Sequence, residues 1–111
     1  MKYFVTDSER TSTNYHEFFK GKWDGVTFWK EDSISLDDNV LYANKGFEEA
    51  LVTIVPEFDP FGETETSLEQ WIQIGKAIPA DDRDSLEMFQ EADAWLTNVF
   101  REYGCFTILG L

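Results

Sequence analysis

One short segment of the chain holds side chains suited to binding at a protein surface. Asp59, Pro60 and Gly62 take the first, second and fourth positions that are favoured in a type I turn. This places Phe61 at the tip of the turn. A phenylalanine there either folds back onto the core together with Phe58, or anchors a partner while carboxylates meet arginine and lysine around it. The candidate partner-binding residues of this segment are Glu57, Phe58, Asp59, Phe61, Glu63 and Glu65.

Carboxylates also bind divalent cations, because hard cations take clustered oxygen ligands. The acidic residues of this segment do not follow the spacing of a calcium-binding loop, which needs ligands at alternate positions, a central glycine and a terminal glutamate. We therefore predict no metal and no cofactor. A carboxylate-based metal-binding protein or enzyme stays as an alternative.

Three aspartates, Asp81, Asp82 and Asp84, precede a long predicted helix. Negative charge near the N-terminus of a helix is stabilised by the helix dipole and by capping, which accounts for their position. A carboxylate there can also face a partner, so Asp82 is a secondary candidate contact.

The chain has one histidine, His16, and one cysteine, Cys105. A histidine can activate a cysteine by taking its proton, but nothing in the sequence brings these two together. One histidine with one cysteine also excludes a zinc site built from such ligands, and no nucleophile-elbow or phosphate-loop motif occurs. We expect His16 at the surface or in a cap, Cys105 as a small buried residue, and no catalytic residues or enzyme activity.

Negative charge is concentrated in the middle of the chain. The protein has 22 acidic and nine basic residues, for a formal net charge of −13. Residues 46–93 hold thirteen acidic residues but only Lys76 and Arg83, and residues 46–75 hold no basic residue. A surface of one sign attracts a partner of opposite charge and repels nucleic acid and anionic lipid. The segment is either a solvated face or a docking surface for a basic protein, and we expect no direct binding to nucleic acid or membrane.

Length and composition predict one folded domain over residues 1–111. Aromatic residues make up 16% of the chain, which is far too many for a disordered acidic tail. A single cysteine cannot form a disulfide within the chain, residues 1–10 lack an apolar signal segment, and no apolar run is long enough to cross a membrane. We therefore expect a cytoplasmic protein.

Hydrophobic spacing predicts an α+β fold. The predicted helices share apolar residues at helical spacing, and cover 14–22, 46–55, 68–77 and 85–103. Residues 51–55 are also rich in β-branched residues, so a strand is the alternative to the helix at 46–55. The predicted strands share β-branched and aromatic residues between turn signals, and cover 2–6, 26–30, 33–36, 40–43 and 105–109. We expect a small, mostly antiparallel sheet of about four or five strands, including both chain ends, packed by three or four helices.

Four tryptophans add to this picture. Trp71 falls on the apolar stripe of its predicted helix and is expected in the core. One of the other three, Trp23, Trp29 and Trp95, is expected to be partly exposed. An exposed tryptophan near acidic residues favours an interface, because aromatic side chains anchor many complexes.

These features together predict a small acidic binding protein that neutralises a basic protein. The most specific hypothesis is an immunity protein that inhibits a nuclease toxin, because a nuclease presents a positive cleft that carboxylates can occupy. The alternative is a phage or plasmid DNA mimic that blocks a restriction or CRISPR nuclease. Such a mimic needs carboxylates spaced along an extended face, whereas an immunity protein needs one compact patch.

Overall fold

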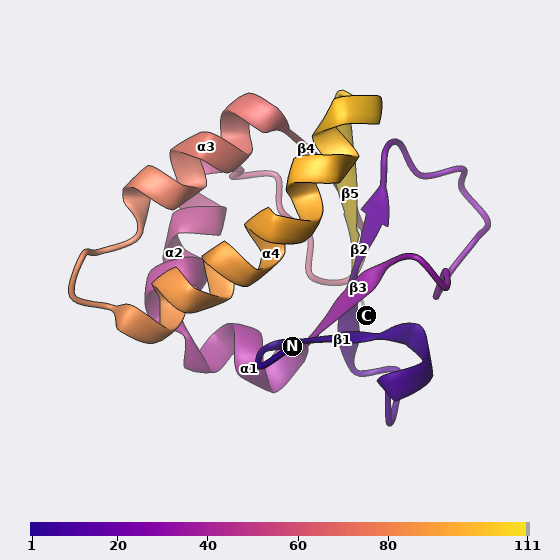
Figure 1. Cartoon of the computed structure of the whole chain (residues 1–111), viewed down its shortest axis with the longest axis horizontal. Coiled ribbons are helices and arrows are strands. Elements are labelled where there is room, and N and C mark those ends of the chain that lie inside the picture. The colour runs from indigo at the N-terminus through magenta and orange to yellow at the C-terminus, as the bar shows by residue number, and fades with distance from the viewer. Residues whose placement is uncertain (111) are drawn as a thin grey trace.

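The computed structural model describes residues 1–110 as a five-stranded sheet packed by helices (Figure 1). In spatial order the strands are β1 (Phe4–Thr6), β3 (Ile34–Asp37), β2 (Tyr15–Lys20), β5 (Cys105–Leu109) and β4 (Glu63–Ser67). All neighbouring strands are antiparallel, and strands from both ends of the chain belong to the sheet. The predicted α+β class is therefore confirmed.

The helices pack on one face of this sheet. They are α1 (Asp38–Ala43), α2 (Lys45–Ile54), α3 (Leu68–Ala77) and α4 (Arg83–Glu102), with one 3-10 turn, η1 (Asp7–Glu9), after β1. In Figure 1, α1, α2, α3 and most of α4 lie to the left of the sheet, while the loop between β2 and β3 extends to the right. This loop, residues 21–33, is called the covering loop below.

Three predicted helices, 46–55, 68–77 and 85–103, are confirmed as α2, α3 and α4. Ser67 and Gln70 form a capping box at the start of α3, a pattern that their spacing in the sequence favours. Ser67 Oγ accepts the Gln70 amide at 3.1 Å, and Gln70 Oε1 accepts the Ser67 amide at 2.9 Å. These predictions succeed because the apolar residues at helical spacing, which predict each helix, also form the face that each helix buries against the core.

The predicted helix at 14–22 is wrong, because Tyr15–Lys20 forms β2 in the centre of the sheet. The first five residues of β2 are all buried. Since successive side chains of a strand point to opposite faces, Phe18 packs under the helices and Phe19 points to the other side. A strand buried on both faces lacks polar alternation, so its aromatic residues imitate helical spacing.

The predicted strand at 40–43 is wrong as well, because these residues belong to α1. Asp37 caps this helix: its Oδ1 accepts the Asn39 amide at 2.7 Å. The same aspartate and asparagine residues favour both tight turns and helix starts, since their side chains bond nearby backbone amides. Residues 37–39, which would also suit a tight turn, therefore begin a helix.

The predicted strand at 26–30 is replaced by part of the covering loop. The Asp24 carboxylate accepts the amides of Val26 and Thr27 at 2.9 and 2.8 Å and also bonds the Thr27 hydroxyl. Gly25, at the bend, has a φ of +87°. The hydroxyl and amide of Thr27, followed by the Val26 amide, hold the pKa of Asp24 at about 2. These bonds form a turn at the Asp24-Gly25 pair and direct the chain away from a strand.

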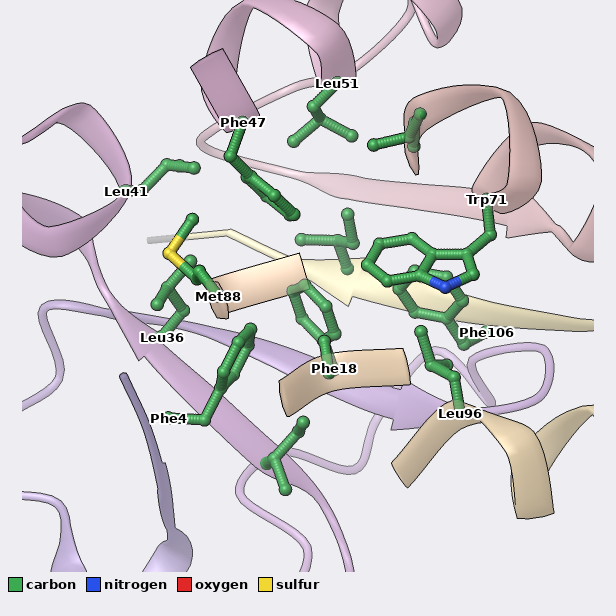
Figure 2. Packing of buried hydrophobic residues seen from close by; sticks show 14 of the residues in the cluster. Phe4, Phe18, Leu36, Leu41, Phe47, Leu51, Trp71, Met88, Leu96 and Phe106 are labelled. Carbon is green, nitrogen blue, oxygen red and sulfur yellow. The ribbon is translucent and has the colours of Figure 1, made fainter. Parts of the chain in front are cut away.

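The two layers meet in one hydrophobic core (Figure 2). Its largest buried side chains include Phe4, Phe18, Leu36 and Phe106 from the sheet, and Leu41, Phe47, Leu51, Trp71, Met88 and Leu96 from the helices. Trp71 stacks on Phe89 with ring centroids 4.4 Å apart, and its Nε1 donates to Asp93 Oδ1 at 2.9 Å. Trp71 is therefore a core residue, as predicted.

Candidate functional site

The turn that carries Phe61 is held by four hydrogen bonds. The Gly62 amide donates to the Asp59 carbonyl at 3.2 Å, as the predicted β-turn requires. The Phe61 amide donates to Asp59 Oδ1 at 2.9 Å, and the Asp59 amide donates to Thr64 Oγ1 at 3.1 Å. The Gly110 amide donates to the Gly62 carbonyl at 2.6 Å and joins the turn to the end of β5. The turn therefore has a fixed shape before any partner binds.

The two phenylalanines of this segment have different environments. Phe58 is half-buried, packs against the core, and lies with its ring centroid 6.2 Å from that of His16. Phe61 is 75% exposed. Phe58 therefore folds back onto the core, whereas Phe61 is exposed to solvent at the tip of the turn.

Phe61 borders a hollow of about 480 Å³, which we call the aromatic hollow. Three further rings line it, and all come from the covering loop: Trp23, Phe28 and Trp29. The other lining residues are Thr13, Gly62, Glu63, Leu109 and Gly110. Two segments far apart in the sequence therefore meet here, the covering loop and the turn before β4.

Contacts within the chain hold the rings of the covering loop. Trp23 Nε1 donates to the Thr27 carbonyl at 2.6 Å, and its ring centroid lies 5.1 Å from that of Phe28. The Arg10 guanidinium lies 3.7 Å from the Trp29 ring centroid, a distance typical of a cation–π contact. Both Trp23 and Trp29 are half-buried, which leaves part of each ring open to the hollow.

A buried carboxylate fixes the covering loop to the sheet. Glu17, in the middle of β2, is fully buried on the sheet face opposite the helices. Its two oxygens accept the amides of Trp29 and Lys30 at 2.6 and 2.9 Å. Trp29 has a φ of +59°, a conformation that bulky residues avoid. Glu17 therefore stabilises the loop conformation that brings Trp29 to the hollow.

The candidate carboxylates beside the turn are all exposed: Glu57, Asp59, Glu63 and Glu65. In β4, Glu63 and Glu65 alternate with two buried threonines, and Glu63 lies in register with Leu109 of the hollow. Among residues 1–110, none of these four carboxylates forms a salt bridge within the chain. They are free to pair with cations from outside.

Asp82 has a different environment, because its carboxylate is used inside the protein. It caps α4, with Oδ1 accepting the Ser85 amide at 3.1 Å and Oδ2 accepting the Ser85 hydroxyl at 2.8 Å. Oδ2 also accepts the Gly46 amide of α2 at 3.0 Å. Asp82 does not line the aromatic hollow, and its capping bonds account for its position.

We expect Asp82→Ala to lower the free energy of unfolding by about 1 kcal/mol at neutral pH, the usual cost of a lost helix cap. The Ser85 hydroxyl and amide, and then the Gly46 amide, hold the pKa of Asp82 below its ordinary value of 3.8. Because the pKa of Asp82 is lower in the folded than in the unfolded protein, its carboxylate stabilises the folded state at pH values above the unfolded-state pKa. This contribution is lost as the pH falls through the folded-state pKa.

Urea unfolding at pH 7 and pH 3 measures this effect. The difference between the wild type and Asp82→Ala should narrow at the lower pH. Asp81→Ala, at an exposed position without a side-chain hydrogen bond among the described residues, is the control and should unfold like the wild type. An equal loss in both variants would contradict the capping role.

The expectation that His16 lies at the surface or in a cap is wrong. It is buried in β2, with Nε2 2.7 Å from Asp38 Oδ1, while Nδ1 has no hydrogen-bond partner among the described residues. Its neighbour Glu17 pairs with Leu109, so Cys105 lies at the far end of β5, roughly 15 Å from His16 by strand rise. The fold does not bring these two side chains together.

Cys105 is partly buried at the start of β5. Burial, and secondarily the Glu65 carboxylate, raise the pKa of its thiol. Because the thiolate is the nucleophile, the thiol is poorly reactive at neutral pH. Cys105 is therefore a packing residue at this position.

Within residues 1–110, no group of three or more His, Cys, Asp or Glu side chains is arranged to hold a metal ion. None of the helices in this part of the chain has the length and apolar character needed to cross a membrane.

The covering-loop residues of the hollow were not predicted from the sequence as part of one site with Phe61. Trp23, Phe28 and Trp29 lie around the Asp24-Gly25 turn, so a cluster of rings in a loop was the available signal. Their meeting with Phe61 depends on strand order, which local patterns do not encode. Comparisons of the chain with protein-family models, with curated proteins and with solved structures found no match.

Proposed function

We propose that this protein is a cytosolic, non-enzymatic binding protein that neutralises a basic protein. The most specific form of the proposal is an immunity protein that inhibits a nuclease toxin by occupying its positive cleft. The observation that supports it best is Phe61, which is 75% exposed on a hydrogen-bonded turn beside the aromatic hollow. A side chain presented in a fixed conformation loses little entropy on binding, so more of its contact energy becomes affinity.

Exposed apolar side chains of the covering loop also support a docking surface. Val26 and Phe28 of the covering loop are 77% and 51% exposed. Burial of one large apolar side chain stabilises a complex by about 1.5–3 kcal/mol. A cluster of rings surrounded by polar groups is the usual composition of the centre of an interface.

The acids of the turn segment differ from two acids of α4 that hold the fold together. On α4, Glu87 pairs with Lys2 at 3.1 Å, and Glu91 accepts the amides of Lys2, Tyr3 and Phe4. Those carboxylates hold β1 in place. The acids near Phe61 have no such internal role, with the exception of one Asp59 oxygen that bonds the turn. Glu57, Glu63 and Glu65 are therefore available to a basic partner, and they lie close together in the chain around Phe61, as an inhibitor with one patch needs.

The chemistry of a nuclease explains why such a patch would inhibit it. An enzyme that binds phosphates must gather arginine and lysine side chains in its cleft. Carboxylates beside an aromatic anchor can pair with those cations while the rings supply apolar contact. Occupation of the cleft then excludes the nucleic acid.

The test begins with capture of a partner from the native host, followed by assay of the captured protein for nuclease activity. We compare the wild type with a triple variant, Asp59→Asn, Glu63→Gln and Glu65→Gln. A matched triple variant, Glu49→Gln, Glu69→Gln and Asp81→Asn, removes the same charge from other exposed positions.

The proposal expects the wild type and the matched variant to capture and inhibit a basic nuclease, and the first variant to lose most of both activities. A captured partner without nuclease activity would reject the immunity-protein form. Capture that falls equally in both variants would show that net charge matters and the patch does not.

We also expect association to depend steeply on salt. The segment of residues 46–75 has seven acidic residues and no basic residue, and its field is screened over about 10 Å at 0.1 M salt. Between about 50 and 500 mM salt the association rate constant should fall about tenfold or more, with a smaller change in the dissociation rate constant. Stopped-flow mixing with the partner measures both, and a flat association rate constant would be evidence against electrostatic docking.

A further inference from the structure

The aromatic hollow combines flat rings with a single charge. Its rings are Trp23, Phe28, Trp29 and Phe61, and Glu63 is the only charged side chain among its lining residues in the described part of the chain. The faces of aromatic rings carry partial negative charge and attract cations. A hollow of about 480 Å³ also falls within the range of small-ligand sites. The lining therefore suits a group that is both cationic and able to stack.

We propose that the aromatic hollow receives the side chain of one arginine of the partner, with its guanidinium stacked on the rings and hydrogen-bonded to Glu63. This inference rests on the proposed function, because it names the partner group that the site recognises. Charge complementarity supports it, since the protein carries a net charge of −13 and the hollow contributes no basic residue.

Arginine fits this lining better than lysine does. A guanidinium is planar, weakly hydrated and able to bond both oxygens of one carboxylate, whereas an ammonium is compact and strongly hydrated. The protein already contains one such contact, because the Arg10 guanidinium lies 3.7 Å from the Trp29 ring centroid. An indole of the covering loop thus accepts a guanidinium at stacking distance.

The position of Glu63 also agrees with this assignment. Glu63 begins β4, directly after the hydrogen-bonded turn, and its exposed carboxylate has no salt-bridge partner among residues 1–110. It borders the same hollow as Phe61. A guanidinium that enters between the rings therefore finds an acceptor at the edge of the hollow.

The experiment titrates the full chain with N-acetylarginine amide and follows the four indole N–H signals by NMR. N-acetylcitrulline amide has nearly the same shape as the arginine amide but no charge, and sodium chloride is added to its solutions to equalise the ionic strength. N-acetyllysine amide carries the positive charge but has no planar guanidinium group. Trp23 and Trp29 line the hollow, while Trp71 and Trp95 do not and are internal references.

The proposal expects a saturable shift of the Trp23 and Trp29 signals with the arginine amide, and binding at least about fivefold weaker for the two other amides. Glu63→Gln should weaken binding of the arginine amide by about fivefold, while Glu69→Gln, at an exposed position on α3, should leave it unchanged. Equal binding of the citrulline or lysine amide, or no saturable shift with the arginine amide, would overturn the arginine assignment.

These outcomes separate the inference from the proposed function. If the wild type captures and inhibits a basic nuclease but its indole N–H signals do not shift with the arginine amide, the inference fails and the proposed function stands. If the arginine amide binds the hollow but no basic partner is captured, the proposed function fails and the hollow remains a guanidinium site.

Discussion

Glu17→Gln is expected to lower the free energy of unfolding by about 2–4 kcal/mol. The substitution removes the negative charge and one of the two oxygens that accept backbone amides at this buried site. In the wild type both carboxylate oxygens accept backbone amides, those of Trp29 and Lys30. A glutamine retains one oxygen and directs an NH₂ group at the second amide. Two donors then face each other where no water reaches, since Glu17 is fully buried.

Equilibrium unfolding in urea, followed by tryptophan fluorescence, measures this loss. The released covering loop should also expose Trp23 and Trp29 and shift native-state emission to longer wavelength. Glu69→Gln makes the same chemical change on the exposed surface and should alter neither property. If Glu17→Gln unfolds like the wild type, the two amides have another acceptor and the anchoring role is wrong.

Phe61→Ala is expected to weaken partner binding by about 2 kcal/mol, roughly 30-fold in Kd, while the melting temperature stays nearly unchanged. The ring is 75% exposed and the turn is held by backbone and Asp59 contacts that do not involve it. Its removal therefore costs the folded state little. The complex loses an anchor at the hollow.

Phe58→Ala is the matched control for this prediction, since it removes the same side chain three residues earlier. Phe58 packs against the core, so its loss should lower the free energy of unfolding by about 2–3 kcal/mol. Calorimetry and binding measurements on both variants separate the roles. If Phe61→Ala unfolds as readily as Phe58→Ala, Phe61 belongs to the folded core and not to an interface.

Elements with one buried stripe could be predicted from the sequence. The helices α2, α3 and α4 each bury a stripe that their sequence displays, and capping residues mark the starts of α3 and α4. The failure at β2 has the opposite cause. Its residues are buried on both faces, and one of them, Glu17, is charged, so neither alternation nor composition identifies a central strand.

Of the candidate site, only the turn that carries Phe61 could be predicted from the sequence, because a local pattern of residues defines it. The turn at Asp59 follows from favoured residues at fixed positions, and the structure confirms its hydrogen bond. The different environments of Phe58 and Phe61 do not follow from that pattern, because they depend on the helix layer and on strand order. Nor does the role of Glu17, since a carboxylate that binds distant amides has no signature in sequence spacing.

The exposed rings at the hollow have a consequence for how the isolated protein behaves in storage. Phe28 and Phe61 line the hollow and are both exposed, so they form an apolar area that a second copy of the chain can contact. At neutral pH the excess of carboxylates keeps copies apart by mutual repulsion. Near the calculated isoelectric point of about 4.2 that repulsion vanishes, so acidification should bring the molecules together through their aromatic surfaces and precipitate them.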